Sequence, residues 1–266
     1  MHRYALNFYL FFILSLFFTN AYSQLENTQS IVKISYKSNP ISQYRILEDD
    51  LKSTATKASY AEFLNGITDH YSLYINLKNR SSIYVLDSTT QIKPRGYDRI
   101  RAALLDTVFF ALKSPEKKTY KHEWIMNQIF FSEGEVGDIK WQLQPEQRTI
   151  DGLECNKAIS LNYPMLTVWY TKEIPVSNGP SIYQGLPGLI VYAEDYFRTI
   201  KLSKVEYLDN KEVFEKLYAA KMEKFKSEKS KGDDYIKEPI LLIKKGDLAK
   251  GSYKYFHKKP YRREVD

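Results

Sequence analysis

Short runs of aromatic and β-branched residues, separated by turn residues, recur along most of this chain. The clearest run covers residues 70–78, where apolar and polar side chains alternate with a period of two. Tyr71, Leu73, Ile75 and Leu77 fall on one face of this predicted strand. Short strands at regular spacing, joined by turns, are typical of an antiparallel sheet. We therefore expect an α+β fold dominated by one curved antiparallel sheet.

The same pattern predicts the other strands. They cover residues 30–37, 41–47, 81–86, 119–131, 138–143, 155–161, 166–171, 189–193, 198–207 and 240–243. Asn79 and Arg80 separate the runs at 70–78 and 81–86, and this short connection predicts a hairpin.

Two or three helices are expected beside the sheet. Residues 48–65 carry apolar side chains near helical spacing, and Gly66 is suited to end a helix there. Residues 97–112 fit a second helix, although the run 107–112 fits a strand equally well. After Asp209 and Glu212, which form a capping pair, a third helix continues to about residue 226. Its apolar stripe consists of Phe214, Leu217 or Tyr218, Met222 and Phe225.

Composition limits the class of protein. A chain of 266 residues that is 43% hydrophobic can bury one sizeable core. Its 11 glycines, 10 prolines and single cysteine exclude a collagen-like, low-complexity or disulfide-stapled protein. We expect one antiparallel β domain over residues 24–208, with a basic helix and C-terminal tail, residues 209–266, packed on it. Cys155 lies in a predicted strand, where a lone thiol is expected to be buried as a small hydrophobe.

The first 23 residues have the features of a signal peptide. A short basic start is followed by an apolar run from Leu6 to Phe18, and the small residues Ala21 and Ser23 precede Gln24. This order predicts a cleavable secretory signal. The apolar run is shorter than the roughly 20 residues that span a bilayer as a helix. We therefore expect an exported protein, located in the periplasm or outside the cell.

Basic charge gathers at the C-terminal end. Residues 201–266 hold 18 basic and 12 acidic residues, whereas residues 24–200 hold 20 of each. This excess favours a solvated helix and basic tail, and an anionic surface as partner of an exported protein is the alternative. Nucleic acid is not expected, because export separates the two and no recognition motif accompanies the charge.

The densest turn residues lie at 179–190. Within them Leu186, Pro187, Gly188 and Leu189 predict a type II turn, in which Pro presets one φ and Gly188 takes a positive φ. Apolar residues flank the turn, so we expect it to pack inward against the sheet. A rigid corner of the fold and a loop that lines a ligand site are the two interpretations.

At these residues the chain resembles a known family. The string Gly185, Leu186, Pro187, Gly188, Leu189 and Ile190 is similar to the signature of the GLPGLI family, exported proteins found mainly in Bacteroidota. Further matches follow the family order at residues 139–143, 151–158, 168–175 and 179–180. The resemblance implies export, and it supplies no catalytic residues to carry over, since the activity of the family is not established. Its strand pattern is similar to half-barrels of the lipoprotein-carrier type, an analogy at the level of fold.

No motif for catalysis or metal binding is found. His70, His122 and His257 are far apart in the sequence and lack the spacing of a zinc site. A Gly-x-Ser-x-Gly elbow is missing as well. Glu194 with Asp195, and Asp233 with Asp234, lie beside predicted turns, where carboxylates are usually solvated. We expect no cofactor, no metal and no catalytic residue.

A binding protein is the function that these features favour. We expect it to hold an apolar or amphipathic ligand in a concave sheet, without enzymatic activity. Trp169, Tyr170 and Tyr183 are the candidate contacts, because their rings offer stacking area and a polar tip. Ordinary core packing is the alternative for these three side chains. The alternative functions are a periplasmic adaptor that docks on an outer-membrane or transport complex and, less favoured, a hydrolase.

Overall fold

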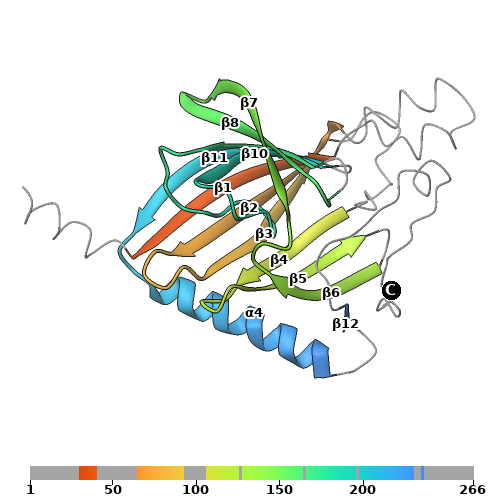
Figure 1. The fold of residues 1–266 in the computed structure, drawn as a ribbon. Helices are drawn as coiled ribbons and strands as arrows, with labels where there is room; N and C mark the ends of the chain where they lie inside the picture. Colours follow the sequence, from red (N-terminus) through yellow and green to blue (C-terminus); the bar gives the residue numbers. More distant parts are fainter. Residues whose placement is uncertain are drawn as a thin grey trace, which may run out of the picture.

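The computed structural model describes residues 30–40, 65–92, 106–125, 128–163, 166–195, 198–230 and 235–236. In this part of the chain one sheet dominates (Figure 1). Its strands are β1 (Ile31–Pro40), β2 (Ile67–Asn76), β3 (Ser82–Gln91), β4 (Asp106–Lys113), β5 (Lys118–Ile125), β6 (Gln128–Glu135), β7 (Trp141–Ile150), β8 (Leu153–Ser160), β9 (Thr167–Thr171), β10 (Leu189–Glu194), β11 (Arg198–Leu208) and β12 (Tyr235–Ile236).

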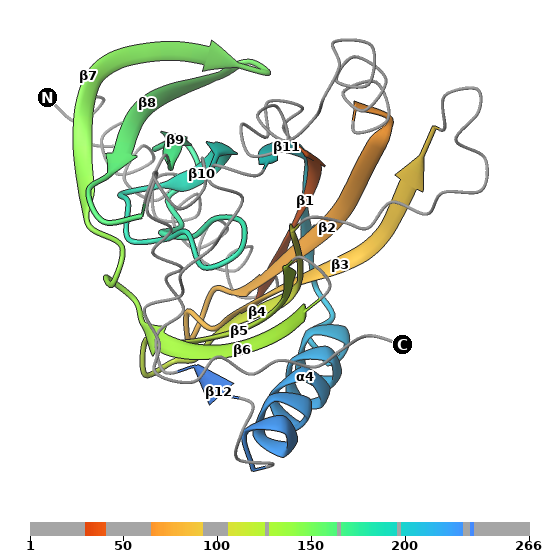
Figure 2. The same cartoon turned by 90° about the vertical axis from the view of Figure 1, so that its right-hand side faces the viewer.

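The sheet order is β12-β6-β5-β4-β3-β2-β1-β11-β10-β9-β8-β7. All neighbours run antiparallel except β12, which pairs parallel with β6. The sheet is open, since β7 and β12 form its two ends. It curves strongly, so that β8 to β10 stand above β4 to β6 in Figure 2. The predicted curved antiparallel sheet is therefore confirmed.

Two cores lie on opposite faces of the sheet. On the concave face, buried side chains from β1, β2, β3 and β8 to β11 form one cluster that includes Tyr36, Tyr71 and Tyr84. The rings of Tyr71 and Tyr84 stack with their centroids 4.5 Å apart. On the other face, Ile83, Phe110 and other residues of β3 to β6 pack against the helix. The period-two alternation in each strand sends neighbouring residues to different cores.

The helix α4 (Glu212–Ser230) covers the outer core. Its apolar stripe is the predicted one, and Phe214 and Phe225 are 3% and 1% exposed. The side chain of Asn210 accepts a hydrogen bond from the backbone N–H of Glu212 at 2.8 Å and caps the helix, one residue after the predicted Asp209. Figure 1 shows α4 running beneath β3 to β6.

The predicted helix count of two or three is wrong for the described residues, which contain one helix. Residues 106–112, the end of the expected helix 97–112, belong to strand β4. The β-branched and aromatic residues there decide for the strand, because they pack well on a pleated surface beside β3 and β5. Residues 48–64 of the other expected helix lie outside the described residues.

Several predictions fall on residues that the structure does not describe. These are the signal peptide 1–23, the strands 41–47 and 240–243, and the tail after residue 236. Within the described residues, no helix combines the length and the apolar character needed to cross a membrane.

The corner around Pro187 packs inward, as predicted. Leu186 and Leu189 are 2% and 0% exposed. The type II turn is wrong, however, because Gly188 does not adopt a positive φ, whereas Gly185 does, at 95°. Gly188 is needed for a different reason: a Cβ at this position would overlap the carbonyl oxygen of Thr171 in β9. The glycine allows two backbones to approach closely.

Candidate functional site

Residues 176–190, here called the signature segment, contact two features that are described below: a buried polar network and a cavity with basic side chains. The segment folds back on itself, since Asn178 pairs with Leu189 and its carbonyl oxygen accepts the N–H of Ile190 at 2.9 Å. Trp141 of β7 fastens the middle of the segment by donating its indole N–H to the carbonyl of Gln184 at 2.8 Å. Its two ends therefore occupy fixed places.

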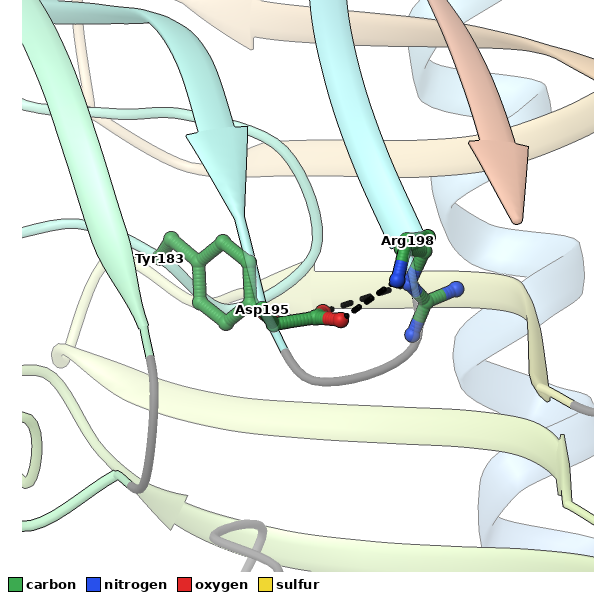
Figure 3. A network of polar contacts seen from close by, with 3 residues as sticks. All are labelled: Tyr183, Asp195 and Arg198. Atoms are coloured by element: carbon green, nitrogen blue, oxygen red, sulfur yellow. Dashed lines mark hydrogen bonds and ion pairs between the residues drawn. The ribbon is translucent and has the colours of Figure 1, made fainter. Parts of the chain in front are cut away.

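The first feature is a buried polar network at the end of β10 (Figure 3). The hydroxyl of Tyr183 donates to Oδ2 of Asp195 at 2.7 Å. The backbone N–H and the Nε of Arg198 donate to the same carboxylate at 2.9 and 3.4 Å. The side chains of Asp195 and Arg198 are 1% and 3% exposed. The expectation that Glu194 and Asp195 are both solvated is wrong for Asp195.

Burial governs the protonation of this region. It raises the pKa of Tyr183 well above its ordinary value, and the neighbouring Asp195 carboxylate raises it further. Burial also raises the pKa of Asp69, while the hydroxyl of Thr89 and the charge of Arg198 act in the opposite direction. A buried carboxylate that meets a tyrosine and an arginine is satisfied by the protein itself. We interpret the network as a structural clamp between the signature segment and β11.

The three candidate aromatic contacts differ in burial and surroundings. Tyr170 and Tyr183 lie in the concave core, 3% and 1% exposed. Trp169 is partly buried at the margin of the same core, and the guanidinium of Arg148 lies 4.0 Å from its ring centroid and 4.9 Å from that of Tyr192. Alternation along β9 separates Trp169 from Tyr170. Their role in ligand binding stays a prediction.

The second feature is a cavity of about 370 Å³ beside the first residues of the signature segment, 176–178. This volume falls at the lower end of the ~300–1,000 Å³ typical of ligand pockets. Three turns and the end of β6 surround it. The lining residues are Ile75, Asn79, Arg80, Lys113, Ser114, Pro115, Lys117, Val136, Val176, Ser177 and Asn178. None of the three candidate aromatic residues is among them.

The lining combines an apolar floor with basic groups. Ile75 and Val176 are 2% and 9% exposed and supply apolar surface. Arg80, Lys113 and Lys117 bring positive charge, and no Asp or Glu occurs among these lining residues. Burial, and secondarily the charge of Arg80, lowers the pKa of Lys113 to about 8. The arrangement suits a ligand with an apolar body and a negatively charged end.

Asn178 lines this cavity and has an unpaired side-chain donor. It is 3% exposed, and its Oδ1 accepts the N–H of Gly179 at 2.9 Å. Its Nδ2 has no hydrogen-bond partner in the described part of the chain. Sequence reasoning missed this site, because Arg80, Lys113 and Asn178 come from distant turns. The only local signal is that Asn178 directly precedes the glycine and proline at 179 and 180.

Within the described residues, His70, His122 and Cys155 are not among the lining residues of the cavity. His70 contacts Thr90 at 3.1 Å, whereas His122 is buried among aromatic rings on the outer face. Cys155 is a free, buried thiol, as predicted, and burial raises its pKa. Within the described residues, no three His, Cys, Asp or Glu side chains gather as metal ligands.

These features define a class: a β-dominated protein with one open curved sheet, an outer helix and a basic cavity next to the signature segment. A family model described as "Protein of unknown function (Porph_ging)" matches residues 160–192. The match covers β9, the signature segment and most of β10. It includes Asn178, Tyr183 and the hexapeptide at 185–190.

The chain is only distantly similar to solved structures. No curated protein matches the chain. A structure of PNGF-II in the C2 space group is 12% identical with a TM-score of 0.39, and the match covers 67% of this chain and 28% of that one. An uncharacterized conserved protein from Thermus thermophilus is 8% identical with a TM-score of 0.32, over 69% of this chain and 82% of that one. This chain thus spans less than a third of the length of PNGF-II.

Proposed function

We propose that this protein is a non-enzymatic binding protein that holds an amphipathic ligand in the basic cavity. The observation that carries the proposal is the combination of an apolar floor at Ile75 and Val176 with positive charge at Arg80, Lys113 and Lys117. Ligand sites of proteins are typically apolar pockets with a few placed polar groups. The signal peptide predicted at residues 1–23 would place this activity in the periplasm or outside the cell.

The rigid surroundings of the cavity support a binding role. Arg80 lies in the β2–β3 turn, where its N–H donates to the carbonyl of Asn76 at 2.9 Å. Lys113 ends β4, and its carbonyl accepts the hydroxyl of Tyr218 from α4 at 3.3 Å. These bonds fix the backbone around the cavity, so that less ordering of the backbone is needed when a ligand enters, and this favours affinity. The cavity replaces the centre of the concave sheet as the proposed site, because buried tyrosines fill that centre.

Calorimetric titration tests the proposal with two amphiphiles of equal chain length, octanoate and 1-octanol. We expect saturable binding of at least one of them. Ser177→Trp places a bulky ring at an exposed lining residue and should abolish binding. Ser203→Trp introduces the same ring at an exposed residue of β11 and should leave binding unchanged. Absence of saturable binding, or binding that Ser177→Trp leaves intact, would contradict the proposal.

The adaptor function remains an alternative prediction. Native mass spectrometry of the protein purified from its own source distinguishes the two. A co-purified small amphiphile supports the binding function, whereas a stoichiometric bound polypeptide that excludes amphiphiles from the cavity contradicts it.

A further inference from the structure

Three basic residues, Arg80, Lys113 and Lys117, line the cavity, and no carboxylate occurs among its lining residues. Arg80 is close enough to Lys113 to contribute to the lowered pKa of its amine, so the two charges repel each other. The amine of Lys113 has a backbone contact, the carbonyl oxygen of Ser177, at the long distance of 3.5 Å. Like charges at a partly desolvated place are unfavourable unless an anion joins them. The cavity therefore has a charge that a ligand is suited to neutralise.

Asn178, which lines the same cavity, has a buried donor without a partner. The N–H of Gly179 requires an acceptor, and this fixes Oδ1 of Asn178 toward Gly179 and leaves Nδ2 as the free group. A buried donor without a partner costs about 1–3 kcal/mol. A ligand acceptor placed within reach of Nδ2 would remove this cost.

From these groups we infer that the ligand carries an oxyanion, a carboxylate or a phosphate, which is bound by Lys113 Nζ and Asn178 Nδ2. This inference rests on the proposed binding function and names the chemical class of its ligand. An oxyanion presents acceptors alone, which match an ammonium and an amide N–H₂ at the same time. A neutral hydroxyl head would satisfy Asn178 but leave the positive charge of Lys113 and Arg80 uncompensated. Pro115, Val136 and Val176 then surround the apolar body.

Four probes test this inference by titration of the full chain: octanoate, octyl phosphate, 1-octanol and inorganic phosphate. We expect octanoate or octyl phosphate to bind at least tenfold more tightly than 1-octanol. Lys113→Met keeps the aliphatic stem and removes the charge, and it should weaken anion binding at least tenfold. Asn178→Asp retains Oδ1, removes the donor and adds repulsion, and it should do the same. Neither substitution should change the affinity for 1-octanol more than about threefold.

Lys78→Met is the matched control. Lys78 lies exposed between β2 and β3, two residues before Arg80, and is not among the lining residues. Lys78→Met changes the net charge of the protein by the same amount as Lys113→Met. Anion affinity should stay within twofold of the original. If Lys78→Met weakens binding as much as Lys113→Met does, the effect is a general one of net charge and the inference is overturned. Because Lys113 is only half-buried, its variant tests the idea even if Asn178→Asp fails to fold.

The possible outcomes distinguish the oxyanion inference from the proposed binding function on which it rests. Equal binding of 1-octanol and the anions, blocked by Ser177→Trp, would overturn the oxyanion and leave the binding function standing. No binding of any probe would overturn both. If inorganic phosphate binds as tightly as octyl phosphate, the oxyanion is supported and the ligand is a free anion, which contradicts the amphipathic body.

Discussion

Gly188 shows how a single residue can be required by distance and not by backbone conformation. Its φ is not positive, yet a side chain there would overlap the carbonyl oxygen of Thr171. The hexapeptide at 185–190 is therefore constrained at one glycine by φ and at the other by close approach. A sequence reveals that a glycine is present, but it does not distinguish these two causes.

The substitution Gly188→Ala is expected to destabilise the protein by about 1–3 kcal/mol, because the signature segment and β9 must move apart. Chemical denaturation monitored by circular dichroism measures the change. Pro187→Ala is the control at the exposed neighbouring position and should cost less than about 1 kcal/mol. Equal effects of the two substitutions would show that close approach to Thr171 is not the constraint.

Tyr183 and Tyr192 form a natural comparison, since each donates its hydroxyl to a carboxylate. Tyr183 meets Asp195 in the interior, whereas Tyr192 meets Glu194 at the surface, at 2.9 Å. We expect Tyr183→Phe to lower the free energy of unfolding by about 1.5–3 kcal/mol, because its hydrogen bond to a buried charged group is lost. Tyr192→Phe should change it by less than about 1 kcal/mol, because water replaces the hydroxyl. Thermal unfolding of both variants would show the difference, and similar losses would contradict the structural role of the buried network.

At the scale of elements, the contact between α4 and the sheet contains a buried histidine. His122 of β5 lies with its ring centroid 5.0 Å from that of Phe110 and 4.5 Å from that of Phe131. Burial, together with Lys224 and Lys221 of α4, lowers its pKa from 6.5 to about 3. The charged groups that face it from the helix are thus cations, and the strands present aromatic rings.

This arrangement predicts that acid loosens the α4 side of the molecule. The unfolded chain binds a proton at His122 below about pH 6.5, whereas the folded chain resists it down to about pH 3. Stability contributed by the neutral ring is therefore present above about pH 6.5 and falls as pH decreases between these values. One such proton corresponds to about 1.4 kcal/mol per pH unit. Denaturant titrations from about pH 7 to about pH 4 measure the slope.

His122→Phe should reduce this acid slope by the contribution of one proton, since the surrounding rings accept another aromatic side chain. His70→Gln is the control, because it removes a histidine at a partly exposed position of β2. If His122→Phe leaves the slope unchanged, carboxylates and not His122 determine the acid response.

Elements could be predicted from the sequence where alternation is strict. The run around Leu73 alternates with a period of two and predicts β2. The apolar stripe ending at Phe225 recurs every three or four residues and predicts α4. The run from Thr107 was ambiguous, because its apolar and β-branched residues fit a strand or a buried helix. In the folded protein this run is strand β4, because it pairs with β3 and β5. Such long-range pairing cannot be read from the local sequence.

The candidate site could not be predicted in the same way. Arg80, Lys113 and Asn178 come together only through the register of a long sheet and the fold of the signature segment. The sequence indicates a solvated acidic pair at Glu194 and Asp195. Arg198 is only three residues from Asp195, but the contact of Tyr183 with Asp195 and the burial of the network depend on the fold of the signature segment. Local sequence patterns thus predict the strands, whereas long-range strand pairing determines which side chains come together in the candidate site.

At the scale of the whole molecule, one sheet carries both cores. Tyr84 points to the concave core and its neighbours Ile83 and Val85 to the outer one, so neither core survives without β3. We expect unfolding in a single cooperative step. Tryptophan fluorescence and far-ultraviolet circular dichroism should give coincident denaturation curves. An early loss of helical signal alone would show that α4 unfolds separately.

The buried thiol of Cys155 can serve as a probe of local unfolding. It is the single cysteine of the chain, it is 1% exposed on β8, and its Sγ donates to the carbonyl of Leu153 at 3.3 Å. A thiol-reactive dye can modify it only after β8 opens. Because β8 is second from the β7 end of the sheet, the labelling rate reveals whether that end frays on its own or waits for the entire fold to come apart.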